Sequence, residues 1–142
     1  MAEQGNSVVL VGNITQEPEL RYTANRQAVT NFSMAVNRRW KDKDSNEWSE
    51  STSYFEVVCW GTLGENVAES VTKGSRVIVN GRLEQQTWEV DGQKRYAVKV
   101  IADEVAPSLR WATATVVKAE RKSADNAVDK PAAINGPVEE PF

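Results

Sequence analysis

The feature that most constrains the fold of this chain is a series of five strand patterns interrupted once by a helical pattern. Alternating or continuously apolar stretches, separated by turn residues, predict strands over residues 7–14, 28–37, 51–60, 75–88 and 94–102. Residues 63–71 instead carry apolar side chains at helical spacing, and Lys73-Gly74 is predicted to close that helix. The order strand, strand, strand, helix, strand, strand therefore predicts an all-β chain with one helix.

Side-chain alternation divides the predicted sheet into a core face and an open face. The apolar residues of the second and third strands that share one parity, and are assigned to the core, are Phe32, Met34, Val36, Phe55, Val57 and Cys59. This assignment places Tyr54 and Trp60 of the third strand on the open face, ~20 Å apart at the rise of a strand. A sheet with one wet face is typical of antiparallel pairing.

The strand order indicates a particular architecture. Five strands with one helix between the third and the fourth form the layout of an OB-fold, a five-stranded Greek-key barrel that holds oligonucleotides or oligosaccharides. The first strand is nearly all apolar, which predicts cover on both faces, and Gly12 within it predicts a bend or a bulge. Pro18 predicts a turn before a short edge segment.

Composition changes after the last strand. Residues 103–115 hold too many apolar side chains for a plain linker, so we expect them to be ordered, for instance against a second subunit. Residues 118–142 are rich in Ala, Lys, Asp, Asn and Pro and are predicted to be a disordered tail. The domain prediction is therefore 1–117 for the barrel and 118–142 for the tail.

Large aromatic residues lie beside cations in the stretch 38–60. Trp40 follows Arg38 and Arg39 and precedes Lys43 in a predicted loop that also contains Trp48. Aromatic rings stack on nucleic-acid bases and cations follow phosphates, so the stretch indicates a surface for single strands. The alternative is that these rings fill a small core.

The fourth strand continues this pattern. Trp88 shares its parity with Arg82, so both are predicted on one face if no bulge intervenes. The Asp91-Gly92 pair that follows predicts a tight hairpin turn.

Several classes of function lack the residues that they need. The chain of 142 residues contains no histidine, which removes the commonest general base and metal ligand, and it has no Gly-rich phosphate loop. Cys59 is the only cysteine and is predicted to be a buried free thiol. We therefore expect no enzyme, no cofactor and no metal site. No apolar run or signal peptide is evident, so a cytoplasmic protein without a membrane partner is expected.

A set of residues and short motifs, in one order along the chain, is typical of a known family: Asn6, residues 8–13, residues 18–22, residues 28–32, Trp40, Val57-Val58, residues 65–68, residues 73–75, Val77, residues 81–83, Trp88, Asp91-Gly92 and Arg95-Tyr96. By these residues the sequence resembles the bacterial single-stranded DNA-binding proteins. The resemblance covers about residues 6–102 and the last few residues.

The resemblance implies a homotetramer that wraps single-stranded DNA without selecting a sequence, in replication, recombination and repair. By position, Trp40, Tyr54, Trp60 and Trp88 correspond to base-stacking aromatics, and Arg21, Lys43 and Lys73 to cations that meet phosphate. Residues 103–113 resemble the ending of actinobacterial members, where an extra strand clamps subunits together. The complete predicted DNA-binding set is Trp40, Tyr54, Trp60, Trp88, Arg21, Arg39, Lys43, Lys73 and Arg82.

The last four residues, Glu139, Glu140, Pro141 and Phe142, resemble the acidic tip that recruits genome-maintenance proteins, and an acidic tip with one aromatic anchor suits a basic-rimmed apolar pocket. Glu84 and Gln86 depart from the family by standing where many members have cations, which predicts lower affinity or a changed site size.

The formal net charge of −3 argues weakly against a nucleic-acid binder, so the prediction depends on where the charges lie. Three alternatives stay open: an assembly subunit that binds proteins more than DNA, a nuclease that holds Mg²⁺ through carboxylates, and a specialised, phage or plasmid copy of the family.

Overall fold

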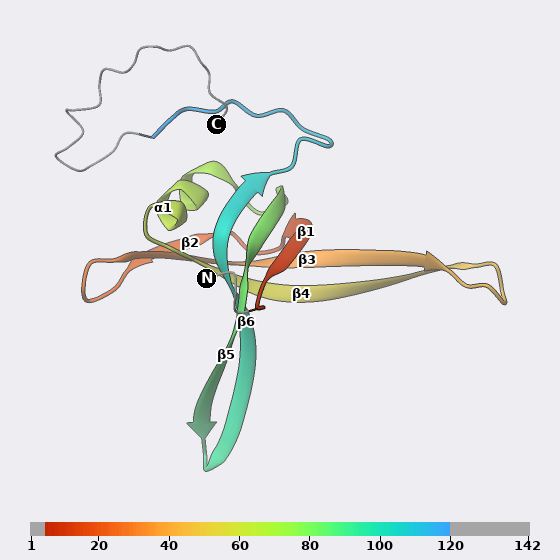
Figure 1. The fold of residues 1–142 in the computed structure, drawn as a ribbon, viewed down its shortest axis with the longest axis horizontal. Coiled ribbons are helices and arrows are strands. Elements are labelled where there is room, and N and C mark those ends of the chain that lie inside the picture. Colours follow the sequence, from red (N-terminus) through yellow and green to blue (C-terminus); the bar gives the residue numbers. More distant parts are fainter. Residues whose placement is uncertain (1–4, 120–142) are drawn as a thin grey trace. The chain divides into compact units, whose positions relative to one another are not determined.

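The computed structural model describes residues 5–119 of the chain. Its strands and helix, all within one compact unit that ends at Ala112 (Figure 1), are β1 (Val8–Ile14), β2 (Glu19–Tyr22), β3 (Ala28–Lys41), β4 (Trp48–Trp60), α1 (Gly61–Ser70), β5 (Arg76–Val90) and β6 (Gln93–Pro107). The predicted order of five main strands with one helix before β5 is confirmed, and so is the short segment after Pro18, which forms the edge strand β2.

The strands form one sheet that closes on itself. Their order is β1-β5-β6-β4-β3-β2, and an additional pairing of β1 with β3 closes the barrel. β4 and β6 run parallel, whereas the other pairs are antiparallel. This is the predicted OB-fold barrel.

The barrel interior contains the residues that alternation assigned to the core. The fully buried side chains come from β1, β3, β4, β5 and β6: Ile14, Thr30, Phe32, Met34, Val57, Cys59, Val77, Val79 and Val100. The α1 side chain of Val67 packs against the same cluster, so the helix covers one end of the barrel. Burial raises the pKa of the Cys59 thiol to about 12, which keeps it protonated and confirms the predicted buried free thiol.

Gly12 has a role other than the predicted bulge. The β1–β5 register runs without interruption from Val8 to Asn13, and a side chain at Gly12 would collide with the backbone carbonyl of Ala35 on β3. Glycine is therefore needed where β1 and β3 approach to close the barrel. The irregularity lies elsewhere, between Asn80 and Gly81, where Asp103 is the additional residue on β6.

The end of the helix and the burial of the first strand also differ from expectation. The helix ends at Ser70, and Gly74, with a φ of 95°, turns the chain only afterwards. The prediction that both faces of β1 are covered is wrong for the single chain, because Val9 is 60% exposed and Val11 is 37% exposed. Among the described residues, none covers these two apolar side chains.

The largest difference concerns the predicted loop around Trp40. β3 and β4 pair continuously as far as Lys41 and Trp48, so both tryptophans lie in strands. Only residues 42–47 form the turn, where Asp42 N–H donates to the Glu47 carbonyl and Asn46 takes a φ of 62°. The backbone N–H and C=O groups of each strand pair with those of the other, so this polar stretch forms an extended two-stranded ribbon.

Candidate nucleic-acid interface

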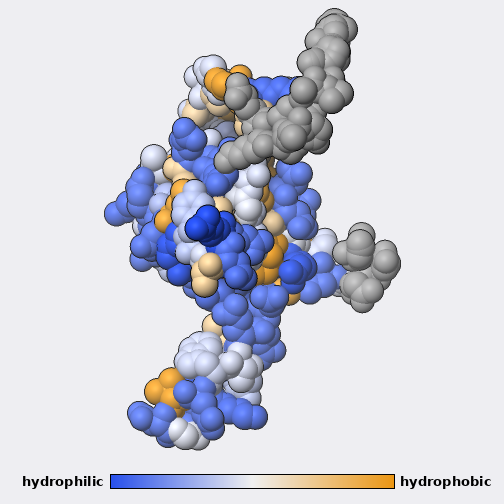
Figure 2. All heavy atoms as spheres, turned by 90° about the vertical axis from the view of Figure 1, so that its left-hand side faces the viewer, coloured by the Kyte–Doolittle hydropathy of each residue, from blue (hydrophilic) through white to orange (hydrophobic). Residues whose placement is uncertain are grey.

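Two long hairpins project from the barrel in different directions (Figure 1). The β3–β4 hairpin ends at residues 42–47, and the β5–β6 hairpin ends at Asp91 and Gly92, whose φ values of 53° and 77° match the predicted tight turn. Hydrophilic side chains dominate the lower hairpin, β5–β6, apart from a hydrophobic patch near its end (Figure 2). Each hairpin thus offers two exposed faces.

Tyr54 and Trp60 lie on the open face of β4, as predicted. Their partners on β3 are the small Ala35 and the buried Val29, and the two rings are 69% and 43% exposed. Arg21 on β2 pairs with Val29, which in turn pairs with Trp60. Since paired residues share a face, Arg21 and Trp60 belong to the same cross-strand row.

The two tryptophans of the β3–β4 hairpin lie on opposite faces. Trp48 pairs with Lys41 and has the parity of Tyr54, whereas Trp40 pairs with Ser49 and has the parity of the core residue Phe32. Trp48 is the more exposed ring, at 63% against 38% for Trp40. Trp48 was absent from the predicted set, and its even spacing from Tyr54 was the signal that could have identified it.

A guanidinium group lies over each of these indoles. The Arg38 Cζ is 4.8 Å from the ring centroid of Trp40, and the Arg39 Cζ is 5.2 Å from that of Trp48. Such cation–π contacts hold a ring and a charge together at the surface. Each face of the ribbon therefore carries an exposed indole with a guanidinium over its ring.

Trp88 lies on one face of the β5–β6 hairpin, opposite Arg95. Arg82 shares this face because the additional residue of the bulge is on β6 and the alternation of β5 continues. A groove of about 730 Å³ runs between this face and β4, and it is lined by Glu56, Gln86, Thr87, Trp88, Ala97 and Lys99. Trp88 and Glu56 of β4 thus line the same groove.

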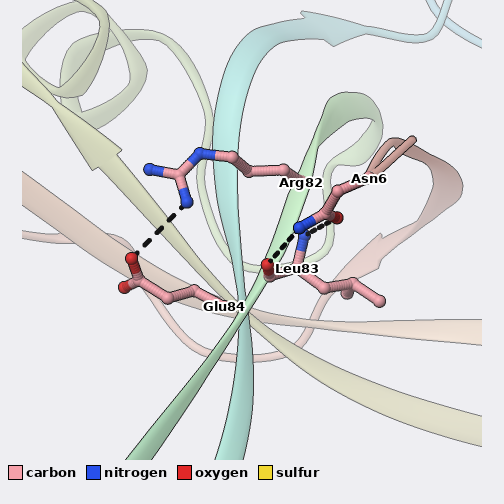
Figure 3. Close-up of polar contacts among 4 residues, drawn as sticks. All are labelled: Asn6, Arg82, Leu83 and Glu84. Carbon is pink, nitrogen blue, oxygen red and sulfur yellow. Dashed lines mark hydrogen bonds and ion pairs between the residues drawn. The ribbon is translucent and has the colours of Figure 1, made fainter. Parts of the chain in front are cut away.

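Carboxylates neutralise two cations near this groove. The guanidinium of Arg82 lies 3.4 Å from Glu84, both on one side of β5, and Lys99 lies 3.9 Å from Glu56 (Figure 3 for the first pair). On the other side of β5, the Asn6 amide donates to the Leu83 carbonyl and accepts from its N–H, which fixes the strand. A phosphate at Arg82 must therefore compete with Glu84.

The remaining predicted cations are more scattered. Lys43 lies in the turn of the β3–β4 hairpin, and Lys73 lies in the loop after α1, where its backbone N–H donates to Glu17. The structure thus brings Arg21, Arg39, Tyr54 and Trp60 to one face, with Trp88 and Arg82 beside the groove. Lys43 and Lys73 lie outside that cluster.

Replacing Glu84 by glutamine is expected to strengthen the binding of a nucleic-acid phosphate at Arg82. The change removes a negative charge and frees Arg82, and an exposed ion pair of this kind contributes no more than about 1 kcal/mol, so a gain of roughly that size is expected. Labelled oligo-dT affinity at low salt measures it. Glu89→Gln, farther along the same hairpin, is the matched control, and equal effects of both changes would contradict the specific pairing.

Within residues 5–119, no group of histidine, cysteine and carboxylate side chains has a geometry that could hold a metal ion. Among the described residues, no helix has both the length and the apolar character that a membrane crossing needs.

The fold and its surface define an OB-fold barrel with exposed aromatic rings and cations on projecting hairpins. A family model described as the single-strand binding protein family matches residues 5–108, and the chain belongs to this family. Membership in a family of binding proteins confirms the prediction that the chain is not an enzyme.

Similar proteins agree with this assignment. A single-stranded DNA-binding protein of Mycolicibacterium smegmatis is 49% identical over 81% of this chain and 71% of its own length. One from Paenarthrobacter aurescens is 42% identical over 85% of this chain and 72% of its own length.

Two solved structures resemble the fold. The small single-stranded DNA-binding protein of Streptomyces coelicolor has a TM-score of 0.62 at 31% identity, covering 72% of this chain and 94% of that one. The Plasmodium falciparum SSB in complex with single-stranded DNA has a TM-score of 0.65 at 25% identity, covering 72% of this chain and 91% of that one.

Proposed function

We propose that this chain binds single-stranded DNA of any sequence, by stacking bases on exposed aromatic rings while neighbouring cations neutralise phosphates. The observation that carries the proposal is that Arg21, Arg39, Tyr54 and Trp60 lie on one face of β2, β3 and β4 in a barrel of the single-strand binding family. Every base has a face that can stack, so such a surface does not select a sequence. Cation contacts make the affinity fall with salt.

The rings proposed to stack on bases are Trp40, Tyr54, Trp60 and Trp88, all at least 38% exposed in the chain. Arg21 and Arg39 lie on the face of Tyr54 and Trp60, and Arg82 lies on the face of Trp88. Lys43 and Lys73 are proposed to meet phosphates farther along the strand. Duplex DNA hides the faces of its bases and is expected to bind poorly.

Trp88→Ala is the sharpest single test of this site. The change is expected to weaken oligo-dT binding by about 1–3 kcal/mol, which is the contribution of one stacked base. Tyr96→Ala is the matched control, because Tyr96 is 61% exposed on the same hairpin but pairs with Thr87 on the opposite face. If Trp88→Ala binds oligo-dT as tightly as the unchanged chain, Trp88 does not stack on bases. The same conclusion follows if Trp88→Ala and Tyr96→Ala lose equal affinity.

We further propose that the chain assembles as a homotetramer. Along β1, residues 8–12 pair with β5 on one side only, because the β3 pairing is confined to Asn13 and Ile14. An unpaired strand edge with exposed Val9 and Val11 beside it suits pairing with the same edge of a second copy, and Ile78 extends this apolar surface. Sedimentation at four times the chain mass supports the proposal, and a monomer contradicts it.

The domain division at residues 117 and 118, with a disordered tail, stays a prediction, as does the protein-binding tip. Glu139, Glu140, Pro141 and Phe142 lie outside the described residues. We propose that they recruit replication, recombination and repair proteins in the cytoplasm, where such a DNA-binding chain would act.

A further inference from the structure

The β3–β4 hairpin carries an indole and a guanidinium on each of its two faces. Direct pairing puts Trp48 on the face of Tyr54 and Trp40 on the other face. Beyond the barrel both faces are exposed, so neither indole is needed for the core. The backbone of the ribbon separates the two rings.

The charges of the paired part of the hairpin are also divided between its faces. The face of Trp40 has Arg38 and, opposite them, Ser49 and Ser51. The face of Trp48 has Arg39 and Lys41 with a single carboxylate, Glu50. Each face is therefore positive over its paired residues, whereas the acids Asp42, Asp44 and Glu47 lie in the turn.

We propose that the β3–β4 hairpin binds two separate segments of single-stranded nucleic acid, one stacked on Trp40, whose ring Arg38 also contacts, and the other on Trp48, whose ring Arg39 also contacts. The proposal rests on the proposed function and adds Trp48 as a stacking residue. Bases on opposite faces of a ribbon lie roughly 10 Å or more apart, so adjacent nucleotides cannot occupy both rings. The hairpin would thus hold two passes of one long strand and shorten its end-to-end distance.

Four substitutions test whether both rings stack. Trp40→Leu and Trp48→Leu keep an apolar side chain but remove the ring, and Trp40→Phe and Trp48→Phe keep a ring that can stack. With labelled oligo-dT on the order of 30 nucleotides, long enough to cover several sites, each leucine variant is expected to bind at least about 5-fold more weakly. The phenylalanine variants are expected to bind within about 3-fold of the unchanged chain.

The double variant tests whether the two rings contribute independently to binding. Since independent sites contribute additively to the binding free energy, the two fold-losses are expected to multiply in Trp40→Leu, Trp48→Leu. A Trp48→Leu chain that binds as the unchanged chain does would overturn the proposal and leave the proposed function intact. An unchanged chain that fails to bind oligo-dT would instead overturn the proposed function itself.

Photocrosslinking tests whether the two segments are separate. A photoreactive benzoylphenylalanine in place of Trp40 or of Trp48, in the full chain, is bound to end-labelled oligo-dT and irradiated. The two probes are expected to crosslink to nucleotides several positions apart. Crosslinks of both probes to the same or adjacent nucleotides would show that a single segment passes the hairpin.

Discussion

A chain with both Tyr54→Ala and Trp60→Ala is expected to bind oligo-dT about 2–6 kcal/mol more weakly than the unchanged chain, the sum of two stacked bases. Tyr54 lies midway along β4 between Trp48 and Trp60 on the same face, and Trp60 shares a cross-strand row with Arg21. Fluorescence polarisation of labelled oligo-dT at fixed salt measures the loss.

Stability provides the control for this double change. Both rings are exposed and lie outside the fully buried core, so the midpoint of urea unfolding is expected to move little. A double variant that stays folded and binds within about 2-fold of the unchanged chain would show that the open face of β4 is not where bases stack.

Gly12→Val is expected to destabilise the barrel by at least about 3 kcal/mol, at the upper end of the cost of overpacking. A side chain at this position meets the backbone carbonyl of Ala35, which cannot move without separating β1 from β3. Since that pairing closes the barrel, the cost falls on the whole fold. Urea denaturation at one fixed protein concentration measures the free energy of unfolding, because assembly would make the result depend on concentration.

Gly92→Ala is the matched control for Gly12→Val. Gly92 has a φ of 77° in the turn of the β5–β6 hairpin, with no atom near the place of a new side chain. Its substitution is expected to cost only about 1–2 kcal/mol of left-handed backbone strain. Equal losses in the two variants would contradict the role of close approach at Gly12.

The sequence was sufficient to predict the barrel because burial and alternation are local signals. The parity of Phe32, Met34, Val57 and Cys59 identified the core face of β3 and β4. The Asp91-Gly92 pair identified the turn of the β5–β6 hairpin. These residues specify one side of a strand or one backbone conformation without information from elsewhere in the chain.

The ribbon around Trp40 and Trp48 was missed for a physical reason. Residues 38–52 are polar and charged, which is typical of loops, and they extend only because each strand hydrogen-bonds to the other. Without the register, the opposite faces of the two indoles could not be assigned.

Other features depend on packing between distant segments. Gly12 is required because β3 approaches it, and the exposure of Val9 and Val11 depends on which strands lie beside β1. The carboxylate of Glu56 reaches Lys99 only because β4 and β6 are neighbours in the barrel. Such contacts cannot be derived from local spacing.

The most direct test of the central claim is the intrinsic tryptophan fluorescence of the full chain, titrated with oligo-dT and then with duplex DNA of equal length at two salt concentrations. Stacking of bases on the exposed indoles predicts strong quenching by oligo-dT, little by duplex, and weaker binding at the higher salt concentration. Absence of quenching by either DNA would contradict the account and would favour an assembly protein whose partners are other proteins.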